Sequence, residues 1–567
     1  MKKWQITKRH QHCFKLAEEL NITRLAARLL TNRGLLSRED IDSYLSPQFS
    51  SSHDPYKIPD LGIGVDRIIK ELSTGNPIGI LGDYDVDGLV SIVILKDFLE
   101  KLNTSTVHYV PNRFNEGYGL SRDGIDFLKE RGVSLIITVD CGATAIKEVE
   151  YAKSLGIDVI VTDHHELDDV LPPAVALIDP KRKDSLFPFK ELAGVGVVYK
   201  LVQGIASKLQ MTLEEDEFLD FVAVGTIADI VPIIDENRIF VKFGLNRLNR
   251  FEHIGLKTLI TTTGLGKRKL DTTQISFILA PRINACGRLG HAEPVLDLFF
   301  TEDEAFALQV AEQLNFDNQK RKEIENHILS EAIDQIKEIP INQSKGIVIA
   351  KRNWHRGVIG LVASKLVEIY SKPVIVISIE NGIAYGSGRS YGEFDIYSAL
   401  KDCASYLISY GGHKYAVGLS LKTEKITSFT GAFLDNLTRN LIPKAEINTI
   451  MIDEELSFKQ ISHNLLDFLT QMAPFGVGNP KPVFLTRCVE LISPISLQVK
   501  NQFRFRLREA NTIVNAVAYR LKSKYDLNTE KYFDIIYNIE TQDFKGKLSF
   551  HLNIIDMIPN DEYQPDA

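Results

Sequence analysis

The 567-residue sequence is poor in several features that define whole classes of proteins. It has five scattered cysteines, none of them in a CxxC pair: Cys13, Cys141, Cys286, Cys403 and Cys488. This small, odd set argues against a disulfide framework and against a thiolate-rich zinc site, and it favours a reducing compartment. No stretch reaches the ~18–20 consecutive apolar residues of a membrane-spanning helix. The polar, basic start also lacks the apolar run of a signal peptide. We therefore expect a cytoplasmic protein with no membrane partner.

The sequence also lacks an excess of positive charge. Lys and Arg number 66 and Asp and Glu number 74, which gives a formal net charge of −8. A protein held to nucleic acid by bulk positive charge would have the opposite sign, so the total argues weakly against such a partner. Hydrophobic residues make up 44 % and charged residues 25 %, a balance typical of folded globular proteins and not of disordered ones.

The rhythm of apolar runs predicts several domains. Short β-branched runs alternate with helix-length segments from about residue 77, which is typical of a doubly wound parallel sheet in an α/β domain. A charged segment follows with Ala305, Leu308, Ala311 and Leu314 at helical spacing. The predicted parts are an N-terminal helical segment (1–55), the parallel-sheet domain (56–300), a long connecting helix (301–340), a smaller α/β domain (341–445) and a C-terminal β-barrel (446–567).

Acidic and imidazole side chains follow the predicted strands at their carboxyl ends. They stand in the segments Gly82–Gly88, Asp140–Gly142, Asp163–His165, Asp179–Pro180 and Gly225–Asp229. The carboxyl ends of parallel strands share one edge, where doubly wound sheets bind ligands. One such Asp could merely cap the next helix. A crowd of carboxylates with one or two imidazoles instead indicates Mn²⁺ or Mg²⁺, and two such ions can activate water for phosphodiester hydrolysis.

These segments resemble the DHH phosphoesterase superfamily, which is named after the triplet at 163–165. The resemblance covers nearly the whole chain and is especially close to the single-strand-specific exonucleases of that superfamily. It rests on GDYDVDG at 82–88, PNRFNEGYGL at 111–120, TVDCG at 138–142, TDHH at 162–165, AGVGV at 193–197, VGTIADIVP at 224–232, PRINACGRLG at 281–290, SGR at 387–389 and GGHKYAVGLS at 411–420. Family members commonly have Ala where this chain has Val86 and Cys286, two small changes.

The resemblance implies a set of metal ligands for two Mn²⁺ or Mg²⁺ ions, namely Asp85, Asp87, Asp140, His164 and Asp229. Asp140 resembles the carboxylate that bridges the ions. Asp83 and Asp163 are implied to orient ligands or waters, and direct ligation by Asp83 stays open. His165 matches the residue that contacts the scissile phosphate and helps to protonate the leaving oxygen.

The resemblance also implies substrate contacts. The smaller domain resembles the DHHA1 domain, in which Gly411 and Gly412 would let backbone amides approach a phosphate beside His413 and Lys414. Taken alone, that Gly-Gly pair is equally well explained by a tight turn. Ser387 and Arg389, in a predicted Gly-flanked loop, resemble a clamp on the terminal phosphate of a strand. Further candidates are Arg282, Arg288, Asn112 and Arg113.

The C-terminal tail resembles an OB-like domain. Its segment 503–508 alternates apolar residues with Arg504, Arg506 and Arg508, which predicts a strand with one basic face. That face could contact a phosphate backbone or simply be solvated.

The resemblance as a whole implies a processive exonuclease that degrades single-stranded DNA from the 5′ end to mononucleotides, in DNA repair and recombination. We expect a monomer, with the single-stranded-DNA-binding protein and a helicase as partners. Two alternatives stay open. A superfamily phosphodiesterase acting on oligoribonucleotides or cyclic dinucleotides would generally be shorter and lack the β tail. A non-catalytic replication scaffold would not need the intact acidic cluster.

Overall fold

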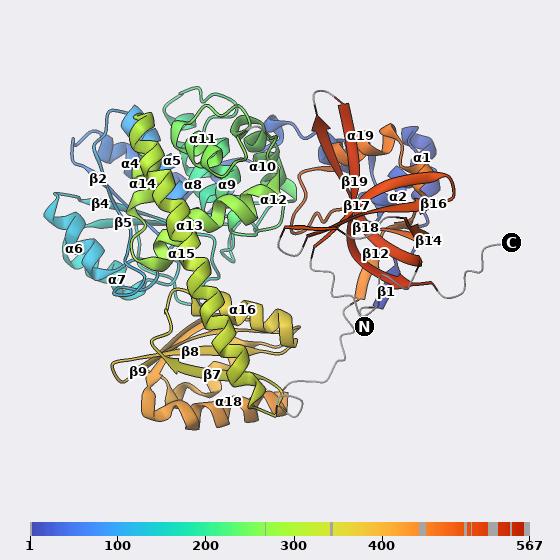
Figure 1. Cartoon of the computed structure of the whole chain (residues 1–567). Helices are drawn as coiled ribbons and strands as arrows, with labels where there is room; N and C mark the ends of the chain where they lie inside the picture. The colour runs from blue at the N-terminus through green and yellow to red at the C-terminus, as the bar shows by residue number, and fades with distance from the viewer. Residues whose placement is uncertain are drawn as a thin grey trace. The chain divides into compact units, whose positions relative to one another are not determined.

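The structure is a computed structural model that describes residues 3–266, 268–340, 344–440, 449–492, 496–499, 502–519, 531–544 and 547–560. The chain divides into two compact units (Figure 1). The larger comprises His53–Val231 and Glu236–Ala445, and the smaller comprises Met1–Ser52, Pro232–Asp235 and Glu446–Ala567. The two ends of the chain therefore belong to the same unit.

A five-stranded parallel sheet forms the first half of the larger unit. Its order is β3-β2-β4-β5-β6, with β2 (Ile78–Gly82), β3 (Thr106–Tyr109), β4 (Leu135–Val139), β5 (Asp158–Thr162) and β6 (Ala176–Ile178). This is the flavodoxin-like order, in which the winding direction reverses between the first and third strands, here β2 and β4. The predicted doubly wound parallel sheet is thus confirmed, and its ligand-binding edge lies where β2 and β4 end.

Helices cover both faces of this sheet. On one face, α6 (Arg122–Glu130) and α7 (Ile146–Ser154) pack Leu128 and Val149 onto strand residues such as Ile136. On the other face lie α4 (Leu61–Leu72), α5 (Val86–Lys101) and α8 (Gly194–Lys208). Because both faces are covered, strands β2, β4, β5 and β6 are buried on both sides, which explains their continuous apolar runs, whereas the edge strand β3 is only partly buried.

A group of helices follows the sheet and ends in the long helix α15 (Glu304–Lys337). The group comprises α9 (Leu219–Ala228), α10 (Asp235–Leu248), α11 (Ile254–Thr262), α12 (Thr272–Gln274), a π-helical turn (Ile275–Leu279), α13 (Ala280–Leu289) and α14 (Glu293–Phe300). The predicted connecting helix is confirmed and runs from the first half of the larger unit to the second (Figure 1). Its predicted apolar stripe was half wrong, because Ala305 and Leu308 are exposed while Ala311 and Leu314 are buried together with Ala307 and Val310.

The second half of the larger unit is a mixed sheet in the order β10-β11-β9-β8-β7. Its elements are β7 (Ile347–Arg352), α16 (Ile359–Tyr370), β8 (Val374–Glu380), β9 (Ile383–Arg389), α17 (Ile396–Asp402), β10 (Ser409–His413), β11 (Ala416–Lys422) and α18 (Ile426–Asn440). Only β7 and β8 pair in parallel. Ser387 and Arg389 therefore lie on a strand and not on the predicted loop. Gly411 and Gly412 lie in β10, and the turn of the hairpin falls at Lys414 and Tyr415.

The smaller unit is built on a β-barrel. Strands β14 (Phe484–Leu491), β18 (Tyr532–Phe544), β19 (Lys547–Pro559), β17 (Thr512–Tyr519) and β16 (Gln502–Glu509) pair in that order, and pairing of β14 with β16 closes the ring. Further strands are β13 (Glu454–Glu455) and β15 (Ser496–Val499). The predicted alternation in β16 is seen, with Phe505 and Leu507 buried and Arg504, Arg506 and Arg508 exposed. The predicted OB-like barrel is confirmed.

The N-terminal segment packs with this barrel. Its elements are β1 (Lys3–Ile6), α1 (Cys13–Leu20), α2 (Arg24–Thr31) and α3 (Arg38–Leu45), and β1 pairs in parallel with β12 (Thr449–Ile452). Leu29 joins the barrel core, next to residues of α19 (His463–Met472). The segments 1–55 and 446–567 therefore contribute to one compact unit, and the residue boundaries of the five parts stay predictions.

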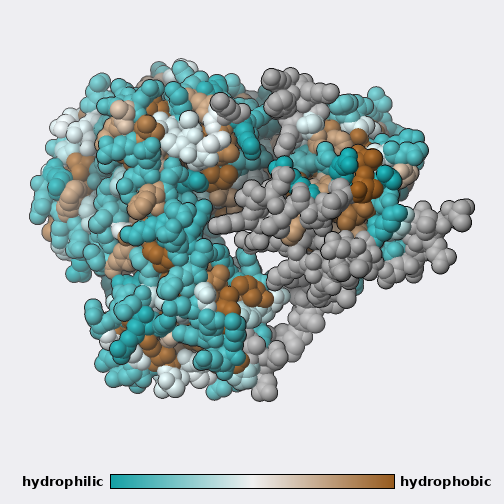
Figure 2. All heavy atoms as spheres, viewed as in Figure 1, coloured by the Kyte–Doolittle hydropathy of each residue, from teal (hydrophilic) through white to brown (hydrophobic). Residues whose placement is uncertain are grey.

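The outer surface is mainly polar on the face of the molecule that carries α15 (Figure 2). Within the described ranges, no helix combines the length and the hydropathy that crossing a membrane requires.

Candidate active site

Carboxylates from the loops after β2 and β4 converge at the expected edge of the parallel sheet. Oxygens of Asp83, Asp85 and Asp140 lie within 4.8 Å of one another, and so do ligand atoms of Asp87, His164 and Asp229. His164 links the two groups, because its Nε2 lies 3.2 Å from Asp140 Oδ1 and 3.6 Å from Asp229 Oδ2. The structure thus brings together all five residues that the resemblance implies as metal ligands, and Asp83 with them.

The first turn of α5 positions two of these carboxylates. Asp85 caps the helix, with Oδ1 accepting hydrogen bonds from the backbone amides of Asp87 (3.0 Å) and Gly88 (3.3 Å). The capping role and the place in the cluster therefore coexist in one side chain, since a carboxylate has two oxygens. Asp87 accepts hydrogen bonds from the amides of Gly194 (2.7 Å) and Val195 (3.0 Å) at the start of α8.

Asp140 is held in an unusual backbone conformation. Its φ of 58° lies in the left-handed region, which costs on the order of 1 kcal/mol for a residue other than glycine and occurs preferentially at functional sites. Gly194 packs directly against it, because a Cβ at position 194 would lie 2.5 Å from Asp140 Oδ1. Only glycine at 194 lets this helix end approach the carboxylate so closely.

The buried donor atoms fit a divalent cation. Asp83 Oδ1, Asp140 Oδ1 and His164 Nε2 are buried and have no hydrogen-bond partner in the described parts of the chain. Buried polar atoms without partners are rare because each costs about 1–3 kcal/mol. Carboxylate oxygens with an imidazole nitrogen are also the ligand types that Mn²⁺ accepts. Cations bound at the two groups would give these atoms partners.

The shifted pKa values of the cluster also indicate a cation site. Burial, together with the neighbouring carboxylates, raises the pKa of Asp83, Asp140 and Asp229 well above the ordinary value. The same causes raise the pKa of Asp87 to about 7. Burial and the nearby His165 lower the pKa of His164 to about 3, so its imidazole is neutral, the form that binds metals. Without a cation these carboxylates repel one another.

His165 forms a pair with Asp163. Its Nδ1 lies 2.7 Å from Asp163 Oδ1, and the Asp163 carboxylate also accepts hydrogen bonds from the amides of His164 (2.7 Å) and Ala143 (2.8 Å). Burial opposes the charges of the pair, but their mutual hydrogen bond lowers the pKa of Asp163 to about 2 and raises the pKa of His165 to about 9. His165 is therefore a protonated imidazolium at neutral pH.

Tyr118 is a site residue that the sequence reasoning did not single out. Its hydroxyl donates to the carbonyl oxygen of Asp140 (2.9 Å) and lies 3.1 Å from His165 Nδ1. The sequence feature that could have indicated it is its position in the NEGYGL stretch that follows β3.

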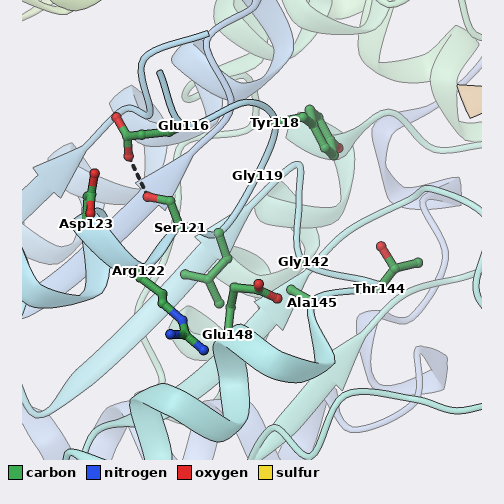
Figure 3. A pocket seen from close by; sticks show the side chains of 11 residues that line it. Glu116, Tyr118, Gly119, Ser121, Arg122, Asp123, Gly142, Thr144, Ala145 and Glu148 are labelled. Carbon is green, nitrogen blue, oxygen red and sulfur yellow. Dashed lines mark hydrogen bonds between the residues drawn. The ribbon is translucent and has the colours of Figure 1, made fainter. Parts of the chain in front are cut away.

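Glu116 shapes this loop by accepting hydrogen bonds from Ser121 Oγ (2.6 Å) and the amide of Asn112 (2.7 Å). Tyr118 also lines a cavity of about 390 Å³, and Figure 3 shows Glu116, Ser121, Arg122 and Glu148 around it.

Three arginines gather beside the acidic cluster. Burial, and then the charges of Arg113 and Arg389, lower the pKa of Arg288 to about 9. Arg288 Nη1 donates to the carbonyl of Gly357 (3.3 Å), and Arg389 Nη1 donates to Ser387 Oγ (3.1 Å). None of the three forms an ion pair with a carboxylate of the described chain, so a bound anion would stabilise them.

The two charge clusters are close neighbours. The charge of Arg113 acts on the pKa of Asp83, and the charge of Asp85 acts on the pKa of Arg288. The guanidinium of Arg113 also lies 4.7 Å from the ring centre of Tyr84, the residue between Asp83 and Asp85.

Of the GGHK residues, the structure places His413 at the site. The imidazole ring of His413 stacks on the ring of His165 at 6.2 Å with 14° between their planes. Lys414 instead pairs with Glu393 (2.5 Å). Gly412 is required by the hairpin, since a Cβ at 412 would lie 2.3 Å from the carbonyl oxygen of Ala416, whereas a Cβ at 411 would meet no atom within 4 Å. A phosphate contact of the backbone at Gly411 and Gly412 stays a prediction.

Asn112 and Arg282 have structural contacts of their own. Asn112 Oδ1 accepts a hydrogen bond from the amide of Phe114 (2.9 Å), so Asn112 organises its loop. Arg282 donates to Asn315 on α15 and lines a separate cavity there. Within the described ranges, the hydrogen bonds of Arg282 go to Asn315 and Ile278 and not to the acidic cluster.

A doubly wound sheet with an acidic–imidazole cluster at its switch point, followed by a mixed-sheet domain, defines a DHH-type phosphoesterase. Models of known families agree: the DHH family, N-terminal domain matches residues 77–226, the DHHA1 domain matches 343–439 and the RecJ OB domain matches 452–556. The chain belongs to the RecJ family of single-stranded-DNA-specific exonucleases, as its relatives show.

The single-stranded-DNA-specific exonuclease RecJ of Bacillus subtilis is 39 % identical over 488 residues, which cover 85 % of this chain and 61 % of that protein. The RecJ of Haemophilus influenzae is 31 % identical over 563 residues, which cover 95 % of this chain and 96 % of that protein. This chain also resembles the crystal structure of Thermus thermophilus RecJ in complex with Mn²⁺. The match covers 100 % of this chain and 80 % of the Thermus chain, with a TM-score of 0.83 and 26 % sequence identity. The same protein has also been crystallised with Mg²⁺.

Proposed function

We propose that this chain is a metal-dependent exonuclease that hydrolyses single-stranded DNA from the 5′ end and releases mononucleotides. One observation carries the proposal: buried oxygens of Asp83 and Asp140 have no hydrogen-bond partner among the described residues and lie next to arginines that form no ion pair there, within one compact unit. A phosphodiester with divalent cations satisfies both groups at once. The activity named for the relatives supports the choice of single-stranded DNA as substrate.

Asp85, Asp87, Asp140, His164 and Asp229 would hold two Mn²⁺ or Mg²⁺ ions, with Asp140 shared between the ions. Asp83 is close enough to bind directly as well. Such ions supply a water of lowered pKa and neutralise charge that develops on the phosphate. The protein itself contributes a pre-arranged set of ligands, fixed by the amides at the start of α8 and by the backbone conformation of Asp140.

His165 supplies the proton for the leaving group. In the hydrolysis, the hydroxyl of water is added to phosphorus, the bond from phosphorus to the 3′ oxygen breaks, and that oxygen takes up a proton. Asp163 fixes the imidazolium of His165 through Nδ1, which leaves Nε2 as the donor. The products are a nucleotide with a free 3′ hydroxyl and a shortened strand with a new 5′ phosphate.

The arginine cluster would hold the phosphate at the 5′ end. Arg389, with Ser387 as its hydrogen-bond partner, would bind this phosphate together with the neighbouring Arg288 and Arg113. Gly360, near the start of α16, keeps it open, because a Cβ there would lie 2.9 Å from Ser387 Oγ and 3.1 Å from Arg389 Nη2. Since each cleavage creates a new 5′ phosphate, the same contacts can act in every cycle.

The cellular setting that we infer is DNA repair and recombination, in which a helicase and the single-stranded-DNA-binding protein would supply and present the strand. We propose a monomer that works in the cytoplasm. The free state of all five cysteines fits a reducing compartment.

The proposal is tested by adding Mn²⁺ to the full chain with long strands labelled at either end. We expect mononucleotides from the 5′ label at once, and no cleavage of blunt duplex DNA. Release from the 3′ label first would contradict the polarity. Cleavage of only short oligoribonucleotides or cyclic dinucleotides would identify the phosphodiesterase alternative, and no cleavage with either metal would favour a scaffold.

A further inference from the structure

A second polar cavity lies in the larger unit where α11, α13 and α15 meet. Its volume is about 420 Å³, within the range of about 300–1,000 Å³ of small-molecule sites. The lining side chains are all polar or charged: Thr262, Arg282, Glu312, Asn315, Asn318, Gln319 and Lys322. None of them belongs to the acidic cluster.

The guanidinium of Arg282 is fixed in this cavity. Its Nε donates to Asn315 Oδ1 (2.5 Å), and its Nη1 donates to the carbonyl of Ile278 (2.6 Å), in the π-helical turn before α13. Asn315 is itself held, because its Nδ2 donates to Thr262 Oγ1 (3.0 Å) and to the carbonyl of Ala311 (3.0 Å). Arg282 Nη2 makes no hydrogen bond with any described residue, so its donors are available to a ligand.

The cavity also holds more positive than negative charge. Burial lowers the pKa of Arg282, and burial together with the charge of Arg282 lowers the pKa of Lys322. Neither cation forms an ion pair with a carboxylate in the described ranges, and Glu312 is the one acid in the lining. A half-buried arginine without a carboxylate partner is unusual in a structural role.

From this arrangement we propose that the cavity is a phosphate-binding subsite separate from the metal cluster. Arg282 would bind two phosphate oxygens with its fork, and Lys322 would add a second charge. The phosphate belongs either to the backbone of the bound strand or to a released nucleotide. This subsite rests on the proposed function, because only a nucleic-acid enzyme brings such ligands to it.

The nearness of the cavity to the arginine cluster favours the strand as the source. The charge of Arg321 acts on the pKa of both Lys322 and Arg288, so Arg321 lies near both, although Arg321 itself pairs with Glu325. A strand whose 5′ end lies at Arg389 would then reach this cavity with a later phosphate.

Lys322→Gln tests the subsite, because Lys322 is only partly covered by its neighbours and its replacement leaves the buried face of α15 unchanged. With divalent ions chelated, binding of single-stranded DNA to the full chain is measured against salt. We expect about a 3- to 10-fold loss of affinity for long strands, less loss for short ones, and a decrease of about 0.7 in the salt slope. Arg282→Gln should act in the same direction, and Glu312→Gln should strengthen binding.

Lys337→Gln is the matched control, since it removes a lysine that pairs with Asp334 at the far end of α15 and should change nothing. Inhibition of cleavage by deoxyadenosine monophosphate separates the two sources. A weaker inhibition in Lys322→Gln, with strand affinity unchanged, would assign the subsite to the released nucleotide. If strand affinity and inhibition both equal those of the Lys337→Gln control, the subsite does not exist. Failure of the proposed function would instead appear as absence of cleavage by the unmodified chain.

Discussion

The two sheets of the larger unit supply different side chains to one site by different structural means. The parallel sheet supplies carboxylates from the loops at its strand ends, as Asp83 and Asp140 show after β2 and β4. The mixed sheet supplies Ser387 and Arg389 from within β9 and His413 from the end of β10. The position of a strand-end loop follows from the order of the strands, whereas the direction of a side chain within a strand depends on the pairing register of that strand. The acidic side could therefore be placed from the pattern of strand ends, whereas Ser387, Arg389 and His413 were implied only by the family resemblance.

The largest effect is expected when the shared carboxylate is changed. Asp140→Asn keeps the shape of the side chain but removes the charge that both cations would share. We expect Mn²⁺-dependent cleavage to fall about 10³-fold or more, which corresponds to ~4 kcal/mol of activation free energy. Single-turnover rates on 5′-labelled single-stranded DNA measure the loss.

Asp179→Asn is the matched control. Asp179 also follows a strand of the parallel sheet, is buried and has one oxygen, Oδ2, without a partner in the described chain, but its Oδ1 accepts a hydrogen bond from the amide of Lys181 (2.7 Å) and it lies outside the ligand groups. Its replacement should leave the rate within a few-fold. Equal losses in both variants would mean that the strand-end carboxylates act by structure and not by binding metal.

The next effect should come from His165. His165→Gln removes the proton donor but leaves the ligand set in place. We expect a rate loss of about 10²–10⁴-fold with Mn²⁺ affinity unchanged. Mn²⁺ binding, measured by calorimetry, separates the two roles: loss of binding in this variant would make His165 a ligand.

On the basic side, Arg389→Lys and Lys414→Gln form a pair. Arg389→Lys keeps the charge but loses the fork, so we expect about a 10- to 100-fold loss on strands with a 5′ phosphate and less on strands with a 5′ hydroxyl. Lys414→Gln should change the rate less than twofold, because Lys414 pairs with Glu393. The ratio of rates on the two 5′ ends is the measurement. A larger loss in Lys414→Gln would place the hairpin turn at the substrate.

The smallest effect concerns stability and pH. The raised pKa of Asp87, about 7, means that the metal-free folded protein binds a proton more tightly than the unfolded chain does. Its contribution to stability is thus fully present below about pH 4 and is lost as the pH rises through 7. Mn²⁺ should raise the melting temperature by several degrees at pH 8 and by less at pH 6. A melting temperature that does not change on addition of Mn²⁺ at either pH would contradict a metal site at this cluster.

The parallel sheet, the connecting helix, the barrel and the acidic cluster could be predicted from sequence, because apolar runs and the acids after them follow simple periodic and topological rules. The strand position of Arg389 and the pairing of Lys414 could not, since they depend on register between strands far apart in the chain. Tyr118 was missed because its role arises from contacts with Asp140 and His165 and not from its residue type. The net charge of −8 was a poor guide to the substrate, because several of the acidic residues lie in the site itself and do not repel nucleic acid from the outer surface.

The most direct test is a crystal structure of the full chain with Mn²⁺ and a short 5′-phosphorylated strand, with anomalous scattering used to locate the metal. We predict two Mn²⁺ peaks that share Asp140, with the 5′ phosphate at Arg389 and Ser387. Mn²⁺ bound away from Asp140, or a strand entering with its 3′ end at Arg389, would contradict the proposed site.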